Sequence, residues 1–113
     1  RQVVHHVPDS HINAYVRFKL ALTETDPQIR PYEEALWADT PEIAATPVSV
    51  SLDLLDAVHQ RWVFLLRSMD DAAFNRTFRH PKLGQVPLYN ALALYVWHGR
   101  HHAAHVEQAL TRA

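Results

Sequence analysis

In the first 22 residues, apolar side chains recur among polar ones with the period of an α-helix. Apolar residues recur at steps of three and four, which predicts a helix from about Arg1 to Leu22. Pro8 lies inside this pattern, and a proline there removes one backbone hydrogen bond. We therefore expect a continuous helix that kinks at Pro8, the alternative being a helix that starts near Pro8. The apolar residues of this pattern are Val3, Val4, Val7, Ala14, Phe18, Ala21 and Leu22.

The segment from Thr23 to Pro47 has no such period and contains four of the seven prolines of the chain. One helical turn is expected within it, at Tyr32 to Asp39. Two antiparallel helices need only a short link, and long connections inside compact domains are uncommon and often functional. The length of this segment therefore predicts a crossover or a lid.

A second helix is predicted from Ser49 to Met69, where apolar residues again follow steps of three and four. Ser49 or Ser51 could cap its first turn. After it, Asp70 to Phe78 could hold a short helix, and the next residues indicate a loop or a tight hairpin around Gly84. One histidine lies within the apolar stripe, which consists of Leu52, Leu55, His59, Trp62, Leu66 and Met69.

The last helix is predicted from about Pro87 to Thr111, with the proline in its first turn. Three helical stripes and a proline-rich crossover predict an all-α protein, an antiparallel helical bundle. Three long helices leave a bundle open on one side, so we expect a fourth from a missing N-terminal part or a partner chain. The chain also begins within an apolar pattern, without Met or a cap, which suggests N-terminal truncation. The last stripe passes from apolar residues into histidines: Leu88, Leu92, Tyr95, His98, His102, His105 and Ala109.

Composition narrows the classes of function. A chain of 113 residues, 48% of them hydrophobic, is expected to form a single soluble domain, residues 1–113. A formal net charge of −1 provides no attraction to nucleic acid or to an anionic membrane. The longest apolar run is too short for a membrane helix and no signal-peptide pattern occurs, so a cytoplasmic location fits. The absence of cysteine excludes disulfides, thiolate metal sites and a thiolate nucleophile.

Nine histidines remain as potential nitrogen ligands for a metal ion. His98 and His102 are four residues apart, so on a helix both lie on one face and could bind one ion. This spacing alone is a weak signal, but the pair lies on the core-facing stripe. His105 extends that face, where it could support the ligands or act as a helix-end cation, and His101 turns aside. The alternative is a pair of structural histidines.

A third ligand has to come from another helix. We favour His6, because His5 points about 100° away and His11 lies too far round the helix. A structural role for His6 is the alternative. Asp9 could orient an imidazole or a bound water, and His59 is more typical of a hydrogen-bonded core histidine than of a ligand. Imidazole ligands suit zinc or nickel rather than magnesium or calcium.

Other polar and aromatic residues are expected to have ordinary structural roles. His80 is expected at the surface, and Arg17 and Glu34 as solvated charges, with lining of the site as the less common outcome. The three tryptophans are expected in the core or in a pocket wall. The sequence contains no phosphate-binding glycine loop, no serine-nucleophile elbow and no H-E-x-x-H motif.

Three blocks of the sequence resemble one protein family, in the family's order. They read "RQVVHHVPDSHINAYVRFKLALTE", "PYEEALWAD" and "LYVWHGRHHAAHVE". Together they are similar to the DinB/YfiT-like family of metal-dependent hydrolases, over essentially the whole chain. The resemblance implies a four-helix bundle whose first helix, before "RQVV", is missing here. It also implies a divalent ion, zinc or nickel, held by His6, His98 and His102. Pro8 departs from the family pattern, which has a small helix former there.

The resemblance implies a hydrolase in which a metal-bound water attacks a small-molecule substrate. One alternative is a transferase, in which a low-molecular-weight thiol of the bacillithiol or mycothiol type attacks instead. A non-catalytic, stress-related metal-binding bundle is a rival from another class, and a plain bundle without a site is a third interpretation. A requirement for added thiol would separate the two enzyme hypotheses.

Overall fold

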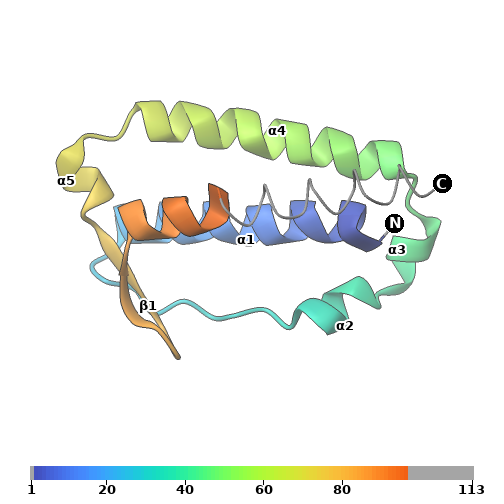
Figure 1. The fold of residues 1–113 in the computed structure, drawn as a ribbon, viewed down its shortest axis with the longest axis horizontal. Coiled ribbons are helices and arrows are strands. Elements are labelled where there is room, and N and C mark those ends of the chain that lie inside the picture. The colour runs from blue at the N-terminus through green and yellow to red at the C-terminus, as the bar shows by residue number, and fades with distance from the viewer. Residues whose placement is uncertain (1, 97–113) are drawn as a thin grey trace.

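Three helices lie side by side in the computed structural model of the chain, which describes residues 2–96 (Figure 1). They are α1 (Gln2–Thr23), α4 (Val48–Arg67) and the helical segment 88–96. The last helix starts at position 88, so Pro87 precedes it and does not lie in its first turn as expected, and positions 97–111 of that prediction lie outside the described residues. The connecting elements are α2 (Glu34–Ala38), α3 (Pro41–Ala45), α5 (Asp71–Phe74), β1 (Thr77–His80) and β2 (Gly84–Pro87).

Helices α1 and α4 run in the same direction. Cross-helix contacts join His5 to Ser51 near the start of both helices and Phe18 to Trp62 nearer their ends. Residue numbers therefore rise together along the pair, while the segment 88–96 runs in the opposite direction (Figure 1). A parallel pair needs a connection that returns along the bundle, and residues 24–47 make that return, so the predicted crossover is confirmed.

Helix α1 continues through Pro8 instead of starting there. Pro8 is fully buried, and because it has no N–H, the carbonyl of Val4 loses its usual helical partner. In the next turn the side-chain amide of Asn13 donates a hydrogen bond to the carbonyl of Asp9 at 2.8 Å. The proline is thus accommodated inside the helix, between His6 and His11.

The start of α4 differs from the expectation. Pro47 occupies the N-cap position and no side chain caps the helix, so the expected capping by Ser49 or Ser51 is wrong. Ser51 lies one turn into α4 and is buried against α1, where its hydroxyl contacts His5. The extended backbone of Pro47 suffices to start the helix, because a proline imposes its own φ angle.

The connection between α4 and the last helix contains a capped short helix and a hairpin. Asp70 caps α5 by accepting a hydrogen bond from the backbone N–H of Ala73 at 2.8 Å. Strands β1 and β2 pair antiparallel, with Phe78 opposite Val86, and Gly84 has a positive φ of 73°. The short helix and the hairpin were both predicted, whereas α3, which starts at Pro41, was not.

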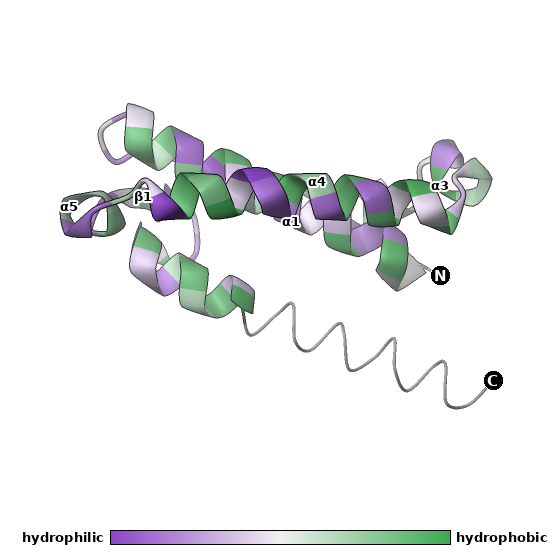
Figure 2. Ribbon diagram, turned by 90° about the horizontal axis from the view of Figure 1, so that it is seen from above, coloured by the Kyte–Doolittle hydropathy of each residue, from purple (hydrophilic) through white to green (hydrophobic). Residues whose placement is uncertain are grey.

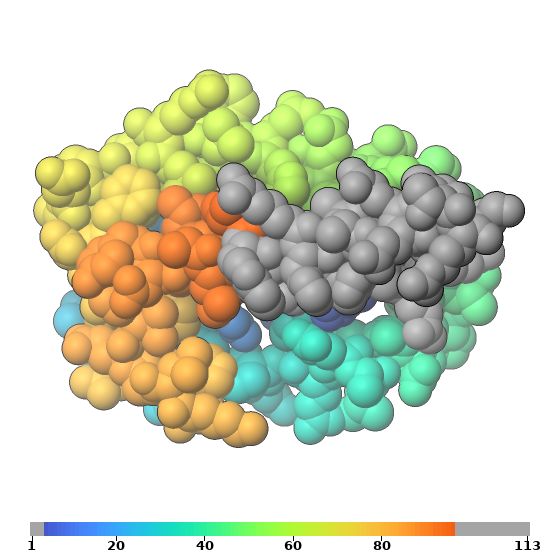
Figure 3. Space-filling model, in the orientation of Figure 1, coloured from blue at the N-terminus to red at the C-terminus, as the bar shows by residue number. Residues whose placement is uncertain are grey.

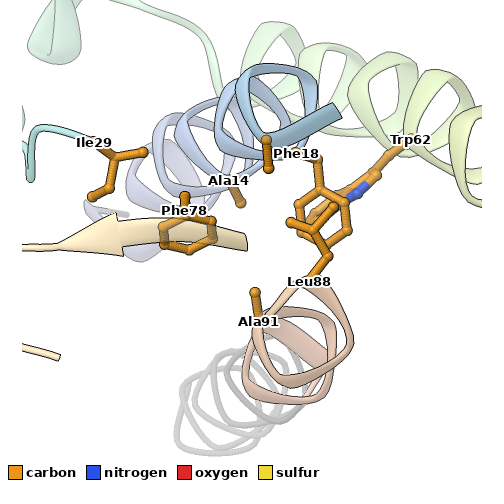
Figure 4. Close-up of a cluster of buried hydrophobic side chains, with 8 residues drawn as sticks. Ala14, Phe18, Ile29, Trp62, Phe78, Leu88 and Ala91 are labelled. Atoms are coloured by element: carbon orange, nitrogen blue, oxygen red, sulfur yellow. The ribbon is translucent and has the colours of Figure 1, made fainter. Parts of the chain in front are cut away.

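A single apolar cluster joins the three helices, the hairpin and the crossover (Figure 4). Phe18 and Leu88 are fully buried, and the indole of Trp62 meets the Phe18 ring edge-on at a centroid distance of 5.3 Å. Alanines at contact positions allow the helices to approach closely. The buried apolar residues are Ala14, Phe18, Ala21, Ile29, Trp62, Phe78, Leu88 and Ala91.

Several apolar side chains of α4 remain exposed, and hydrophobic positions are visible along its outer side (Figure 2). Val50, Leu54 and Phe64 are exposed, as is Leu52, which was expected on the core-facing stripe. Of that stripe, Trp62 and Leu66 pack against the core instead. None of the described helices is long and apolar enough to cross a membrane.

Candidate functional site

The adjacent histidines at the start of α1 have different surroundings. His5 is 3% exposed and faces α4, where its Nδ1 lies 2.6 Å from the Ser51 hydroxyl. Its other ring nitrogen, Nε2, is buried and has no hydrogen-bond partner among the described residues. His6 is half-buried on the neighbouring face of the helix. His5 is therefore tied to the parallel helix, and His6 faces a different direction.

Asp9 lies close to both of these rings. Burial raises the pKa of its carboxyl group, the Glu42 carboxylate raises it further, and the imidazoles of His6 and His5 lower it. Asp9 is thus an acceptor next to the first-helix histidines, which is the place that the sequence predicted for it. Whether it orients a ligand ring stays a prediction.

The two last-helix ligands predicted from the sequence, His98 and His102, lie outside the described residues, and so does His105. Within residues 2–96, no three histidine or acidic side chains come together in a way that could hold a metal ion. The predicted set of His6, His98 and His102 therefore stays a prediction, with His6 as its described member.

His11 and His59 form a pair between α1 and α4. Nδ1 of His11 lies 2.5 Å from Nε2 of His59, and the two rings stack with centroids 4.7 Å apart. A hydrogen bond between two imidazoles needs a proton on one nitrogen and a lone pair on the other. Burial lowers the pKa of His59, against a smaller opposing effect of Asp56. His59 is thus hydrogen-bonded, as expected, but it is exposed and not in the core, and its partner was not foreseen.

An apolar cavity of about 280 Å³ opens beside this histidine pair. It lies between α1, α4 and the segment 88–96, and Trp62 and Tyr95 form part of its wall. The two aromatic rings contact each other with centroids 5.8 Å apart. We refer to it as the His11 cavity. Its walls are almost entirely apolar, so it could hold an uncharged hydrocarbon part of a molecule.

A second cavity, also of about 280 Å³, lies on the other side of Tyr95. Arg17, Tyr32 and His80 line it together with apolar side chains of the hairpin and of the segment 88–96. We refer to it as the Arg17 cavity. His80 is half-buried here, so the expectation that it lies free at the surface is wrong: the hairpin folds its ring back toward α1.

The sequence analysis gave lining of the site as the less common outcome for Arg17, and it did not foresee the contact of Ser51 with His5. Arg17 donates a hydrogen bond from Nη1 to the Tyr95 hydroxyl at 3.0 Å, across a separation of 78 residues. The feature in the sequence that could have indicated this role is a cation one position before Phe18, which is buried on α1; a charge at such a position is usually interpreted as solvated. Trp62 is buried in the core, as expected, whereas Trp37 is exposed and packs against Tyr32 at a centroid distance of 4.9 Å.

Comparison with known proteins places this arrangement in a family. A curated protein of Bacillus mycoides strain KBAB4 and one of Bacillus cereus strain B4264 are each 56% identical over 106 residues. Both are named "Putative metal-dependent hydrolase", and the alignment covers 94% of this chain. The chain spans 61% of the length of these relatives.

A solved structure has the same fold. YfiT from Bacillus subtilis, described as a probable metal-dependent hydrolase with an unusual four-helix bundle topology, superposes with a TM-score of 0.93 at 50% identity. The match covers 99% of this chain and 65% of YfiT, so the described helices form part of a four-helix bundle of this type. The family model of the DinB superfamily matches residues 1–106, and the chain therefore belongs to the DinB superfamily.

Proposed function

We propose that this chain provides the metal site of a metal-dependent hydrolase, with His6, His98 and His102 as the ligands of one divalent ion. The names of its relatives support a metal-dependent hydrolase. The observation that carries the assignment of the ligands is the register of the last helix against α1.

That register is antiparallel and can be read from the described residues. Leu88, at the start of the segment 88–96, shares the core with Phe18 near the end of α1. Tyr95, two turns later, lines the same cavity as His11, which lies two turns earlier on α1. Each step forward on one helix is therefore matched by a step back on the other.

A helix that continues beyond residue 96, as the sequence predicts, would bring positions 98 and 102 alongside the turn of α1 that carries His6. Three imidazoles would then converge from two helices, a donor set that suits zinc or nickel. His5 is the less suitable neighbour because its ring is turned toward Ser51 on α4.

The ion, when bound, would supply a Lewis acid that lowers the pKa of water and polarises a carbonyl group. The residues of the chain would hold it and shape its surroundings. Asp9, beside His6, would accept a hydrogen bond from a ligand ring or from a water molecule. The apolar walls around Trp62 and Tyr95 would limit access of bulk water from the side of the His11 cavity.

Metal titration of the purified, untagged chain tests the ligand set. The wild type is expected to bind one equivalent of Zn²⁺ or Ni²⁺ tightly, and His6→Ala, His98→Ala and His102→Ala are each expected to lose this binding. His101→Ala is the matched control, because position 101 turns aside from the predicted ligand face. Retention of tight binding in the three variants, or equal loss in the control, would contradict the proposal.

Turnover of a panel of small esters and amides tests the reaction class. Metal-dependent hydrolysis without an added thiol, lost in His98→Ala, is the expected result. Activity that appears only with a low-molecular-weight thiol would instead identify a transferase. A metal that raises the melting temperature while no substrate is turned over would support the non-catalytic alternative.

A further inference from the structure

The Arg17 cavity has the features of a binding site that the proposed metal ligands do not explain. It lies between α1, the middle of the crossover, the hairpin and the segment 88–96 (Figure 3). Its volume of about 280 Å³ is close to the lower end of the usual range for small-molecule sites, roughly 300–1,000 Å³. The lining is mainly apolar and includes Phe78, Val86 and Leu94.

Arg17 brings a positive charge into this apolar lining. Its side chain is half-buried, and its guanidinium makes one hydrogen bond, to the Tyr95 hydroxyl at 3.0 Å. No carboxylate forms an ion pair with it in the part of the chain that the structure describes. A guanidinium carries five N–H donors, and four of those of Arg17 have no hydrogen-bond partner among residues 2–96. A partly buried cation without a carboxylate partner favours an anionic group nearby.

His80 adds a neutral donor to the same cavity. Its Nδ1 accepts hydrogen bonds from the backbone N–H groups of Lys82, at 3.1 Å, and Leu83, at 3.3 Å. The proton of the neutral ring therefore resides on Nε2, because Nδ1 is occupied as an acceptor. Nε2 has no hydrogen-bond partner among residues 2–96. Burial lowers the pKa of His80, and the charges of Arg17 and Lys82 lower it further, so the ring is a neutral donor near pH 7.

The remaining polar residues define the limits of the site. Tyr32 lines the cavity, and burial raises the pKa of its hydroxyl to about 12. The Tyr32 hydroxyl is therefore an uncharged part of the cavity wall near neutral pH. Glu34 also lines the cavity and is exposed, so one carboxylate stands at the rim. It would repel an anion that approached from that side.

We propose that the Arg17 cavity binds the carboxylate group of a small molecule that has an apolar body. The Arg17 guanidinium would pair with the carboxylate, His80 Nε2–H would donate a second hydrogen bond, and the apolar body would lie against Phe78 and Leu94. The small, mainly apolar volume favours a carboxylate over a larger and more strongly hydrated phosphate.

The position of the cavity connects it to the proposed metal centre. Ser10, which lines the cavity, lies one turn beyond His6 on α1, so a molecule anchored at Arg17 could extend toward the proposed ion. This extension rests on the proposed function. It implies that the substrate is a hydrolysable compound carrying a carboxylate away from the bond that is cleaved. Binding in the cavity itself does not require the metal.

Binding of phenylacetate to metal-free chain, prepared in EDTA and followed by titration NMR, tests the proposal. Phenylacetamide is the neutral probe of the same shape. The amide is expected to bind at least about tenfold more weakly, because it cannot form a charge-assisted pair with Arg17. Arg17→Met is expected to weaken phenylacetate binding by about tenfold, and Glu34→Gln to strengthen it by removing the like charge.

Lys19→Met is the matched control, because Lys19 is an exposed cation two positions along α1 that does not line the cavity. It removes the same charge and is expected to leave phenylacetate binding unchanged. Far-ultraviolet circular dichroism and the melting temperature verify that each variant is folded. Equal binding of the two probes, equal loss in Arg17→Met and Lys19→Met, or no binding of phenylacetate would overturn the proposal. Inorganic phosphate that competes more strongly than phenylacetate would overturn the choice of a carboxylate.

The two proposals can fail separately. The phenylacetate titration is performed without metal, so loss of the predicted metal ligands leaves its outcome unchanged. If the chain binds zinc through His6 but does not bind phenylacetate, the proposed metal centre stands and the proposed substrate class is wrong.

Discussion

Ser51 shows how a single polar residue can link two helices. Its hydroxyl is the partner of Nδ1 on the buried His5. Replacement by alanine would leave that ring without a partner on either nitrogen in the described part of the chain, so Ser51→Ala is expected to lower the free energy of unfolding by about 1–2 kcal/mol. Urea denaturation of metal-free protein measures the change.

Ser49→Ala is the control for this substitution. Ser49 is exposed on the same turn of α4, and its replacement is expected to change stability by less than about 0.5 kcal/mol. Equal effects of the two substitutions would show that the helix start, rather than the contact with His5, is responsible.

The lowered pKa of His59 predicts that the folding stability depends on pH. Burial holds the pKa of His59 below its ordinary value of 6.5, with Asp56 acting in the opposite direction and His11 as the hydrogen-bonded neighbour. Near that pH the unfolded chain binds more protons than the folded chain at this position, so folding stability falls as the solution becomes more acidic. The loss begins around the unfolded pKa and grows below it.

His59→Gln is therefore expected to reduce the stability lost between about pH 7.5 and about pH 5.5. Glutamine retains a donor and an acceptor but does not titrate in this range. Thermal unfolding in EDTA at both pH values measures the difference. A steeper loss in the variant than in the wild type would contradict the assignment.

At the scale of the element, the turn of the hairpin depends on Gly84. Its φ of 73° lies in the left-handed region, and a Cβ added there would meet no atom within 4 Å. The cost of a substitution is therefore conformational. Gly84→Ala is expected to lower the free energy of unfolding by about 1 kcal/mol.

Asparagine tolerates the left-handed region better than alanine, so Gly84→Asn is expected to lose less stability. Thermal unfolding of the two variants under identical conditions compares them. A larger loss for asparagine than for alanine would indicate a steric limit that the open space around Gly84 does not suggest.

Elements were predictable wherever a local pattern determines them. Apolar steps of three and four predicted both ends of α1 and of α4 to within one or two residues, and Gly84 identified the hairpin. The capping of α4 was not predictable, because Ser51 makes its hydrogen bond to another helix instead of to its own backbone. The five-residue α3 is too short to show a period.

At the scale of the whole molecule, the site residues that escaped prediction depend on contacts between distant segments. Arg17 meets Tyr95 because an antiparallel helix returns beside α1, and His11 meets His59 because the crossover makes α1 and α4 parallel. The spacing of residues on one helix cannot reveal either contact. The assignment of His6 stays a prediction, which rests on one helix face and on the family resemblance.

Leu88 connects the core to the proposed metal centre. It is fully buried between α1 and α4 at the start of the segment 88–96, which precedes His98 and His102 in the sequence. Leu88→Ala is expected to lower the free energy of unfolding by about 2–5 kcal/mol, because it leaves a cavity between three helices. Tyr89→Ala, at the exposed neighbouring position, is expected to cost less than about 0.5 kcal/mol.

Leu88→Ala also tests whether metal binding depends on the packing of the last helix. If the register of the last helix brings its histidines to His6, Leu88→Ala should weaken zinc binding although it removes no ligand. Leu88→Met retains the volume at a cost below about 1.5 kcal/mol and is expected to restore most of the affinity. Zinc titration of folded protein, monitored by calorimetry below the melting temperature of each variant, measures both effects. Zinc affinity that is unchanged in a clearly destabilised Leu88→Ala would show that the ligands assemble independently of this packing, and the register argument for His6 would fail.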